Sequence, residues 1–210
     1  HGRGIYILDD IRPMRNLNAD IWNKEVHLFD IPDQVLNNGR FGGGGPSASG
    51  GWYAGNPPSQ PSIDYYLKER LTSGKAELEI YDDKGTLLQT IPGSKRKGIN
   101  KLYWNLRGTP PKVASGSTKM DNAGFIAPMV LPGTYTAKLK IKDQEYTKTF
   151  RCVHDDENKA LSVADRKQVY EEAMKVQGLY NNVNQLIDTI RVTQEKLKLD
   201  STNKMNKAFI

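Results

Sequence analysis

The residues of this chain best suited to chemistry are three pairs of neighbouring carboxylates: Asp9/Asp10, Asp82/Asp83 and Asp155/Asp156. Paired carboxylates can act as general acid and base, or bind calcium. Each pair lies at the end of a predicted strand or in a predicted turn, where aspartate is favoured because its side chain accepts hydrogen bonds from its own backbone. We therefore interpret the pairs as turn residues and predict no catalytic residue in this chain.

Metal and phosphate ligands are also sparse. A single cysteine, Cys152, and three histidines far apart in the sequence do not predict a zinc site. One cysteine also excludes a disulfide within the chain. The run Gly42–Gly45 lacks the Lys-Ser/Thr pair that completes a phosphate-binding loop. The sequence therefore predicts no metal site and no cofactor.

Aromatic residues in and near the glycine-rich segment allow two interpretations. Trp52 and Tyr53, like Trp22 earlier in the chain, could stack on sugar rings, which would make this chain a carbohydrate-binding module. They could equally pin the segment against a folded domain, and we favour pinning because tryptophan is usually well buried. Glycan contact at Trp52 and Tyr53 is kept as the alternative.

The overall charge is mildly basic, with 30 basic and 24 acidic residues and a net charge of +6. This excess is weak support for an anionic partner. Lys138, Lys140 and Lys142 alternate along a predicted strand without interleaved aromatic residues, so we expect a solvent-facing strand rather than a nucleic-acid surface. No apolar run is long enough to predict a membrane-spanning segment.

The chain begins with a predicted strand, residues 1–10, that has no evident partner nearby. Because a lone strand is not stable by itself, we expect the chain to be a piece of a longer protein. Residues 11–20 are predicted to be a short connector, and Glu25–Ile31 a second strand. Residues 37–62 are rich in glycine and proline, which predicts a linker.

Residues 63–155 show the period of two that is typical of half-buried antiparallel strands. Tyr135, Ala137, Leu139 and Ile141 alternate with polar residues, as do Leu102, Trp104 and Leu106. Short strands separated by turns predict a small β-sandwich, with Trp104 as the anchor of its core.

Residues 156–210 have a helical pattern instead. Apolar residues recur at alternating spacings of four and three, which predicts a long amphipathic, coiled-coil-like helix. We expect its seam to be an interface covered by a returning helical arm, by another part of the protein or by a partner chain. The seam residues are Val176, Tyr180, Val183, Ile187 and Ile190.

Three stretches of the predicted sandwich carry a resemblance to a known module: residues 80–88, residues 97–107 and the phrase Leu131-Pro132-Gly133-Thr134-Tyr135-Thr136-Ala137. Together they resemble the immunoglobulin-like module of the flagellar hook-capping protein. In order along the chain, the opening strand, the phrase Gly55-Asn56-Pro57-Pro58, this module and the long helix are similar to the C-terminal region of bacterial, Bacteroidota-type sortilin-like, BNR-repeat β-propeller proteins.

This resemblance implies that Ile5–Leu8 close the last propeller blade and that the helix is the first arm of a helical hairpin. It also implies an exported protein of a Gram-negative bacterium, located in the periplasm, at the outer membrane or outside the cell. The tripeptide Asp200-Ser201-Thr202 is similar to the O-glycosylation acceptor of Bacteroidota, which makes Ser201 a modification candidate.

The expected fold is mainly β with a C-terminal helix, divided into the end of a propeller (1–36), a linker (37–62), an Ig-like sandwich (63–155) and the helix (156–210). The expected function is that of a non-catalytic structural and interaction module of a surface or secreted assembly. Its partners would be the upstream propeller and other protein chains. The alternatives are an accessory part of a glycan- or peptide-hydrolysing propeller enzyme, and a carbohydrate-binding module.

Overall fold

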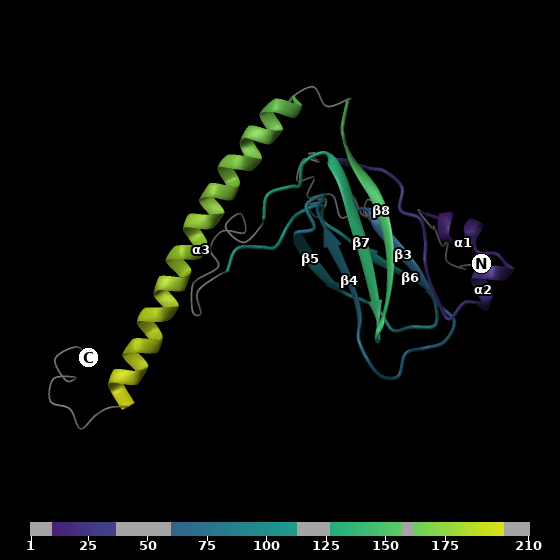
Figure 1. The fold of residues 1–210 in the computed structure, drawn as a ribbon, viewed down its shortest axis with the longest axis horizontal. Coiled ribbons are helices and arrows are strands. Elements are labelled where there is room, and N and C mark those ends of the chain that lie inside the picture. Colours follow the sequence, from purple (N-terminus) through teal and green to yellow (C-terminus); the bar gives the residue numbers. More distant parts are fainter. Residues whose placement is uncertain (1–9, 37–59, 113–126, 157–161, 200–210) are drawn as a thin grey trace, which may run out of the picture. The chain divides into compact units, whose positions relative to one another are not determined.

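The structure, a computed structural model, describes residues 10–36, 60–112, 127–156 and 162–199 (Figure 1). Its contacts divide the chain into two units, residues 1–106 with 131–163, and residues 107–130 with 164–210. The predicted propeller-closing strand and nearly all of the predicted linker lie outside the described residues. The four predicted domains stay predictions. The two units have other residue ranges than those domains.

The first unit contains two β-sheets. The smaller sheet has the antiparallel order β1-β3-β6, formed by Val26–Leu28, Ser62–Leu67 and Gly98–Tyr103. The larger sheet has the order β2-β8-β7-β4-β5, with strands Gln34–Leu36, Gln144–His154, Gly133–Ile141, Ala76–Tyr81 and Leu87–Pro92. Strand β2 pairs in parallel with β8, and the other pairs are antiparallel. With about 31% helix and 36% strand, the described structure is mixed α/β rather than mainly β.

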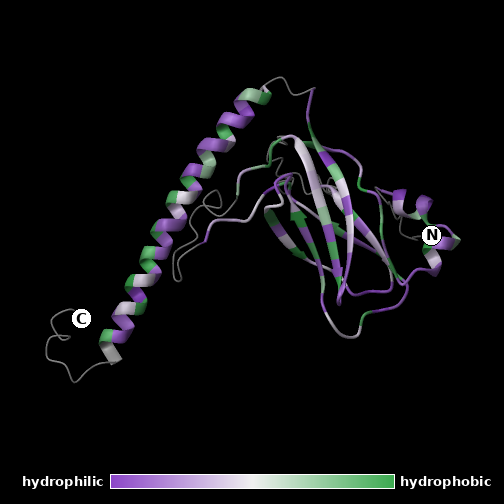
Figure 2. Ribbon diagram, in the orientation of Figure 1, coloured by the Kyte–Doolittle hydropathy of each residue, from purple (hydrophilic) through white to green (hydrophobic). Residues whose placement is uncertain are grey.

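Strand β7 has the burial pattern that its sequence predicts. Tyr135, Ala137, Leu139 and Ile141 are buried, whereas the residues between them are only half-buried. Figure 2 shows the corresponding change between hydrophobic and hydrophilic residues along the strands. The two-residue turn Lys142-Asp143 then leads into β8, so that Ile141 pairs with Gln144.

An aromatic cluster lies in the core of this unit. Trp104 is fully buried, and its ring centroid lies 5.6 Å from that of Tyr135 on β7 and 5.8 Å from that of Phe150 on β8. The alternation of Leu102, Trp104 and Leu106 predicted that Trp104 lies within a strand. Strand β6 ends at Tyr103, however, so Trp104 is the first residue after the strand. Its backbone N–H still donates to the Pro61 carbonyl at 3.2 Å.

Two short helices replace the predicted connector. Helix α1 spans Arg12–Asn16 and α2 spans Ala19–Asn23. Pro13 is suited to the first turn of α1, where its missing N–H leaves no hydrogen bond unmade. Asn18 caps α2 by accepting a hydrogen bond from the Ile21 N–H at 2.9 Å.

The second unit contains the long helix α3, Val163–Leu199, together with the described segments 107–112 and 127–130. The two segments meet in an antiparallel bridge between Arg107 and Met129. Arg107 also donates through Nη1 to the Ala127 carbonyl at 2.7 Å.

Candidate functional site

The sequence of helix α3 allows a long helix because it contains no proline. Asp165 places a negative charge in the first turn, where it stabilises the start of the helix. Two surface ion pairs add to it: Lys167 with Glu171, and Lys175 with Glu172. Apolar and polar residues recur along the ribbon from turn to turn (Figure 2). These residues divide the helix surface into faces that differ in burial.

One face is polar and covered. Arg166 and Asn184 are buried, and the other side chains on this face are half-buried: Tyr170, Ala173, Gln177, Tyr180, Asn181, Ile187 and Asp188. Segment 107–112 runs along this face. Its Lys112 donates through the backbone N–H to Asn181 Oδ1 at 2.8 Å and through Nζ to Asp188 Oδ2 at 2.7 Å.

Two further contacts tie the same face to the chain. Gln177 Nε2 donates to the Thr109 carbonyl at 3.0 Å, and Arg166 Nη1 lies 3.6 Å from Met129 Sδ. Asn184 Nδ2 donates to the Tyr180 carbonyl at 2.8 Å within the helix. The amide groups of Asn184 and Gln177 are thus partnered through their nitrogens, in the helix and in the segment beside it, whereas Gln177 Oε1 accepts no hydrogen bond within the described chain.

Another face is apolar and exposed. Val176, Leu179, Val183, Leu186 and Ile190 are 64%, 66%, 55%, 60% and 48% exposed, respectively. We call these five residues the apolar stripe. Their spacings of three and four place them in one row along the helix.

The predicted seam therefore divides between two faces. Val176, Val183 and Ile190 lie on the apolar stripe, whereas Tyr180 and Ile187 are half-buried toward the covered face. Leu179 and Leu186 were missed, because the prediction followed each valine by a step of four residues. A step of three from Val176 and Val183 would have found them, since both steps lead to neighbouring positions on a helix.

A charged cluster in the first unit is the other candidate for chemistry. Asp10 accepts from Arg12 at 2.6 Å and lies 3.8 Å from Lys101 Nζ, which is also 3.7 Å from Asp64 Oδ1. Ser62 Oγ lies within 3.5 Å of Asp10 and 3.3 Å of Asp64. Asp64 is buried, and within the described chain its Oδ1 accepts no hydrogen bond.

The two carboxylates of this cluster differ in acidity. The hydrogen bond from Arg12 holds the pKa of Asp10 well below its ordinary value. Burial raises the pKa of Asp64, and the charge of Asp10 adds to that effect while Lys101 opposes it. Two cations and two carboxylates balance in charge, so the arrangement is that of a paired structural network.

One residue of the second pair, Asp82, acts as a turn residue. Asp82 accepts hydrogen bonds from the backbone N–H groups of Lys84 and Thr86 at 3.0 and 2.7 Å. The same role applies to Asp10, which accepts from the Arg12 N–H at 2.9 Å. In the described part of the chain, no three His, Cys, Asp or Glu side chains gather as metal ligands would.

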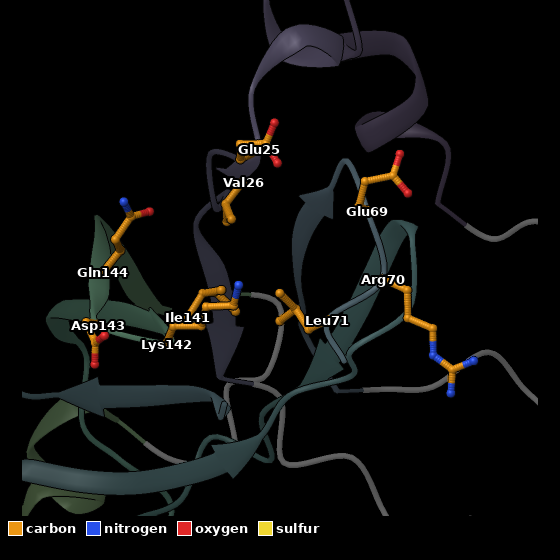
Figure 3. Close-up of a pocket in the computed structure, with 9 residues that line it drawn as sticks. All are labelled: Glu25, Val26, Glu69, Arg70, Leu71, Ile141, Lys142, Asp143 and Gln144. Atoms are coloured by element: carbon orange, nitrogen blue, oxygen red, sulfur yellow. The ribbon is translucent and has the colours of Figure 1, made fainter. Parts of the chain in front are cut away.

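A cleft of about 420 Å³ lies where the start of β1, the segment after β3 and the β7–β8 turn meet (Figure 3). Val26, Leu71 and Ile141 form its apolar part, and the Arg70 side chain is turned away from them. Two of the acidic residues at its rim are already paired, Glu25 with Lys68 and Glu69 with Lys97. The described residues that line this cleft include no serine, threonine, cysteine or histidine.

An exposed aromatic residue lies on α2. Trp22 is 56% exposed, and its ring is stacked on that of Tyr66, with centroids 5.7 Å apart and planes at 28°. Trp52 and Tyr53, the predicted glycan contacts, lie outside the described residues. So does Ser201, the predicted glycosylation site.

Comparison with known proteins gives no match, whether with family models, curated proteins or solved structures. The resemblance to sortilin-like, BNR-repeat propeller proteins therefore stays a prediction. Within the described residues, none of the helices is both long and apolar enough to cross a membrane.

Proposed function

We propose that this chain is a non-catalytic structural and interaction module, and that the apolar stripe of α3 is its docking surface. The observation that carries the proposal is the exposure of five large apolar side chains in one row, each at least 48% exposed. Contiguous exposed apolar patches usually mark interaction sites, because leaving them in water costs free energy that a partner recovers. The covered face of the same helix is mainly polar, so most of the large apolar side chains of α3 are on the exposed face.

The setting of the module follows from the sequence motifs. We propose that the two sheets form an Ig-like sandwich, and that the chain is the C-terminal region of an exported, Bacteroidota-type sortilin-like propeller protein. The upstream propeller and other chains of a periplasmic, outer-membrane or extracellular assembly would be its partners. Two sheets followed by a long helix are compatible with this proposal, and the phrases around Gly85, Trp104 and Pro132-Gly133 support it.

Thiol footprinting of the protein in its native host tests this function. Val183→Cys introduces a thiol on the apolar stripe, and Gln185→Cys introduces one at an exposed position outside the stripe. In the native assembly, we expect a membrane-impermeant maleimide to label the Gln185→Cys variant fully and the Val183→Cys variant weakly. Both variants should be labelled equally after denaturation. Equal labelling in the assembly would contradict a docking function.

Trp22 favours glycan binding as a second candidate function. Its exposed ring is held in place by stacking on the buried Tyr66, and a fixed aromatic face is what a sugar ring stacks on. Binding of the 210-residue chain to a glycan array, lost in Trp22→Ala and kept in Tyr103→Ala, would support it. Tyr103 is a suitable control because it is also exposed but has no such stacking partner among the described rings. An array without binding contradicts this candidate.

A further inference from the structure

We infer that the occupant of the apolar stripe is a second copy of this chain, and that the two α3 helices pair in parallel as a two-stranded coiled coil. This inference rests on the proposed docking function and deepens it. The first argument is the type of side chain at each position. Taking Val176, Val183 and Ile190 as a positions of a heptad makes Leu179 and Leu186 its d positions. β-Branched residues at a together with leucine at d favour parallel pairs of helices.

The length of the pattern supports the same conclusion. The a positions extend from Val169, which is 59% exposed, to Leu197, and so cover four heptads. The a row is apolar throughout these four heptads, and a and d are both apolar from Val176 to Ile190. Glu172 and Thr193 occupy the first and last d positions. The strongest helix–helix contact would therefore be made by the segment from Val176 to Ile190.

The flanking charges are compatible with a second copy. The e positions Ala173, Tyr180, Ile187 and Gln194 are all uncharged, so no like charges would face each other between g and e of two parallel helices. Lys175, at g, would face the uncharged Tyr180 of the other copy five residues on. The stripe thus complements itself, as the interface of a symmetric dimer must.

The helix also leaves this face open to a second copy. Segment 107–112 is bonded to Gln177, Asn181 and Asp188, which belong to the covered face. At 100° per residue these positions are separated from the apolar stripe by more than a quarter of the circumference. The bonds of segment 107–112 to α3 therefore leave the apolar stripe itself uncovered, and the half-buried e positions Ala173, Tyr180 and Ile187 form the border between the two faces.

Two measurements on the full 210-residue chain test this inference: the molecular mass in solution and disulfide cross-linking. Sedimentation equilibrium should give a dimer for the wild type and for Gln185→Asp, and a monomer for Leu186→Asp with unchanged near-UV circular dichroism. A wild-type monomer or a higher oligomer would overturn the inference. A wild-type monomer whose position 183 is nevertheless protected in the native assembly would overturn the second copy and leave the docking function standing.

Disulfide cross-linking tests the parallel orientation. Val176→Cys, Val183→Cys and Ile190→Cys should each form homodimers on mild oxidation, because equal a positions face each other in parallel pairs. Gln185→Cys and the wild type, whose only cysteine is the buried Cys152, should remain uncross-linked. Cross-links that form only when Val176→Cys is mixed with Leu186→Cys would show antiparallel pairing, in which a faces d, and overturn the parallel arrangement.

Discussion

Asp64 and Lys101 lie opposite each other on the neighbouring strands β3 and β6, with 3.7 Å between Asp64 Oδ1 and Lys101 Nζ. The carboxylate is buried, whereas the lysine side chain is 28% exposed. Lys101 also reaches Asp10, which is paired with Arg12. The strand pairing thus brings a buried charge, its partner and the start of α1 together.

Removing the lysine should destabilise the first unit. We expect Lys101→Met to lower the free energy of unfolding by about 1–3 kcal/mol, because a buried carboxylate would lose its nearest cation. Asp64→Asn in the same background should recover part of that loss, as a double-mutant cycle in chemical denaturation would measure. Lys148→Met is the matched control: its partner Asp30 is exposed, so the loss should be about 0–1 kcal/mol. Additive effects of the two substitutions would contradict this pairing.

Trp104 should be far more important for stability than Trp22. We expect Trp104→Ala to cost about 3–5 kcal/mol, because it removes a fully buried ring from contact with Tyr135 and Phe150. Trp22→Ala should cost about 0.5–1.5 kcal/mol, since an exposed ring loses mainly its stacking on Tyr66. Thermal unfolding followed by near-UV circular dichroism measures both, and equal shifts of the midpoint would show that Trp104 is not a core anchor.

Strands β4, β7 and β8 of the larger sheet could be predicted from local pattern, because one face of each is buried. Strand β2 was not predicted, since three residues are too few to show an alternation, and β5 contains no buried residue. Leu139 and Lys138 differ in burial as their alternation requires. The short helices could not be predicted in this way, since five residues are too few to show a helical period. The cap at Asn18 was the available signal, and it is a weak one without a following periodic run.

The burial of α3 was less accessible to sequence reasoning. Its pattern predicted the helix and three residues of the apolar stripe. Leu179 and Leu186 were missed because residues three and four positions after a valine are both its neighbours on a helix, and the pattern does not show which of the two is exposed. The covered face depends on Lys112, which lies more than seventy residues before its partner Asp188. No local pattern indicates a contact between residues so far apart in the sequence, and polar residues such as Asn184 give no hydrophobic signal.

The buried thiol should make stability depend on pH in the alkaline range. Burial raises the pKa of Cys152 from 9.0 to about 12. The folded state therefore keeps the proton that the unfolded chain loses, and stability that is fully present below pH 9.0 falls as the pH rises toward about 12. Relative to Cys152→Ser, the wild type should lose up to about 1.4 kcal/mol per pH unit in that range. Parallel stability curves of the two proteins between these pH values would contradict the shift.

The ion pair between Lys112 and Asp188 should hold segment 107–112 on α3 without contributing much to global stability. Lys112 is 63% exposed and Asp188 29% exposed, so water weakens their attraction, and a double-mutant cycle with Lys112→Met and Asp188→Asn should give about 0–1 kcal/mol. The local effect should be larger, because the same lysine also donates its backbone N–H to Asn181. We expect faster hydrogen exchange at Lys112 in Asp188→Asn and unchanged exchange in strand β7. Glu195→Gln, an exposed acid near the end of the same helix, serves as the control. If exchange at Lys112 is the same in the wild type, Asp188→Asn and Glu195→Gln, the ion pair does not hold the segment. The backbone hydrogen bond to Asn181 is then sufficient to hold it.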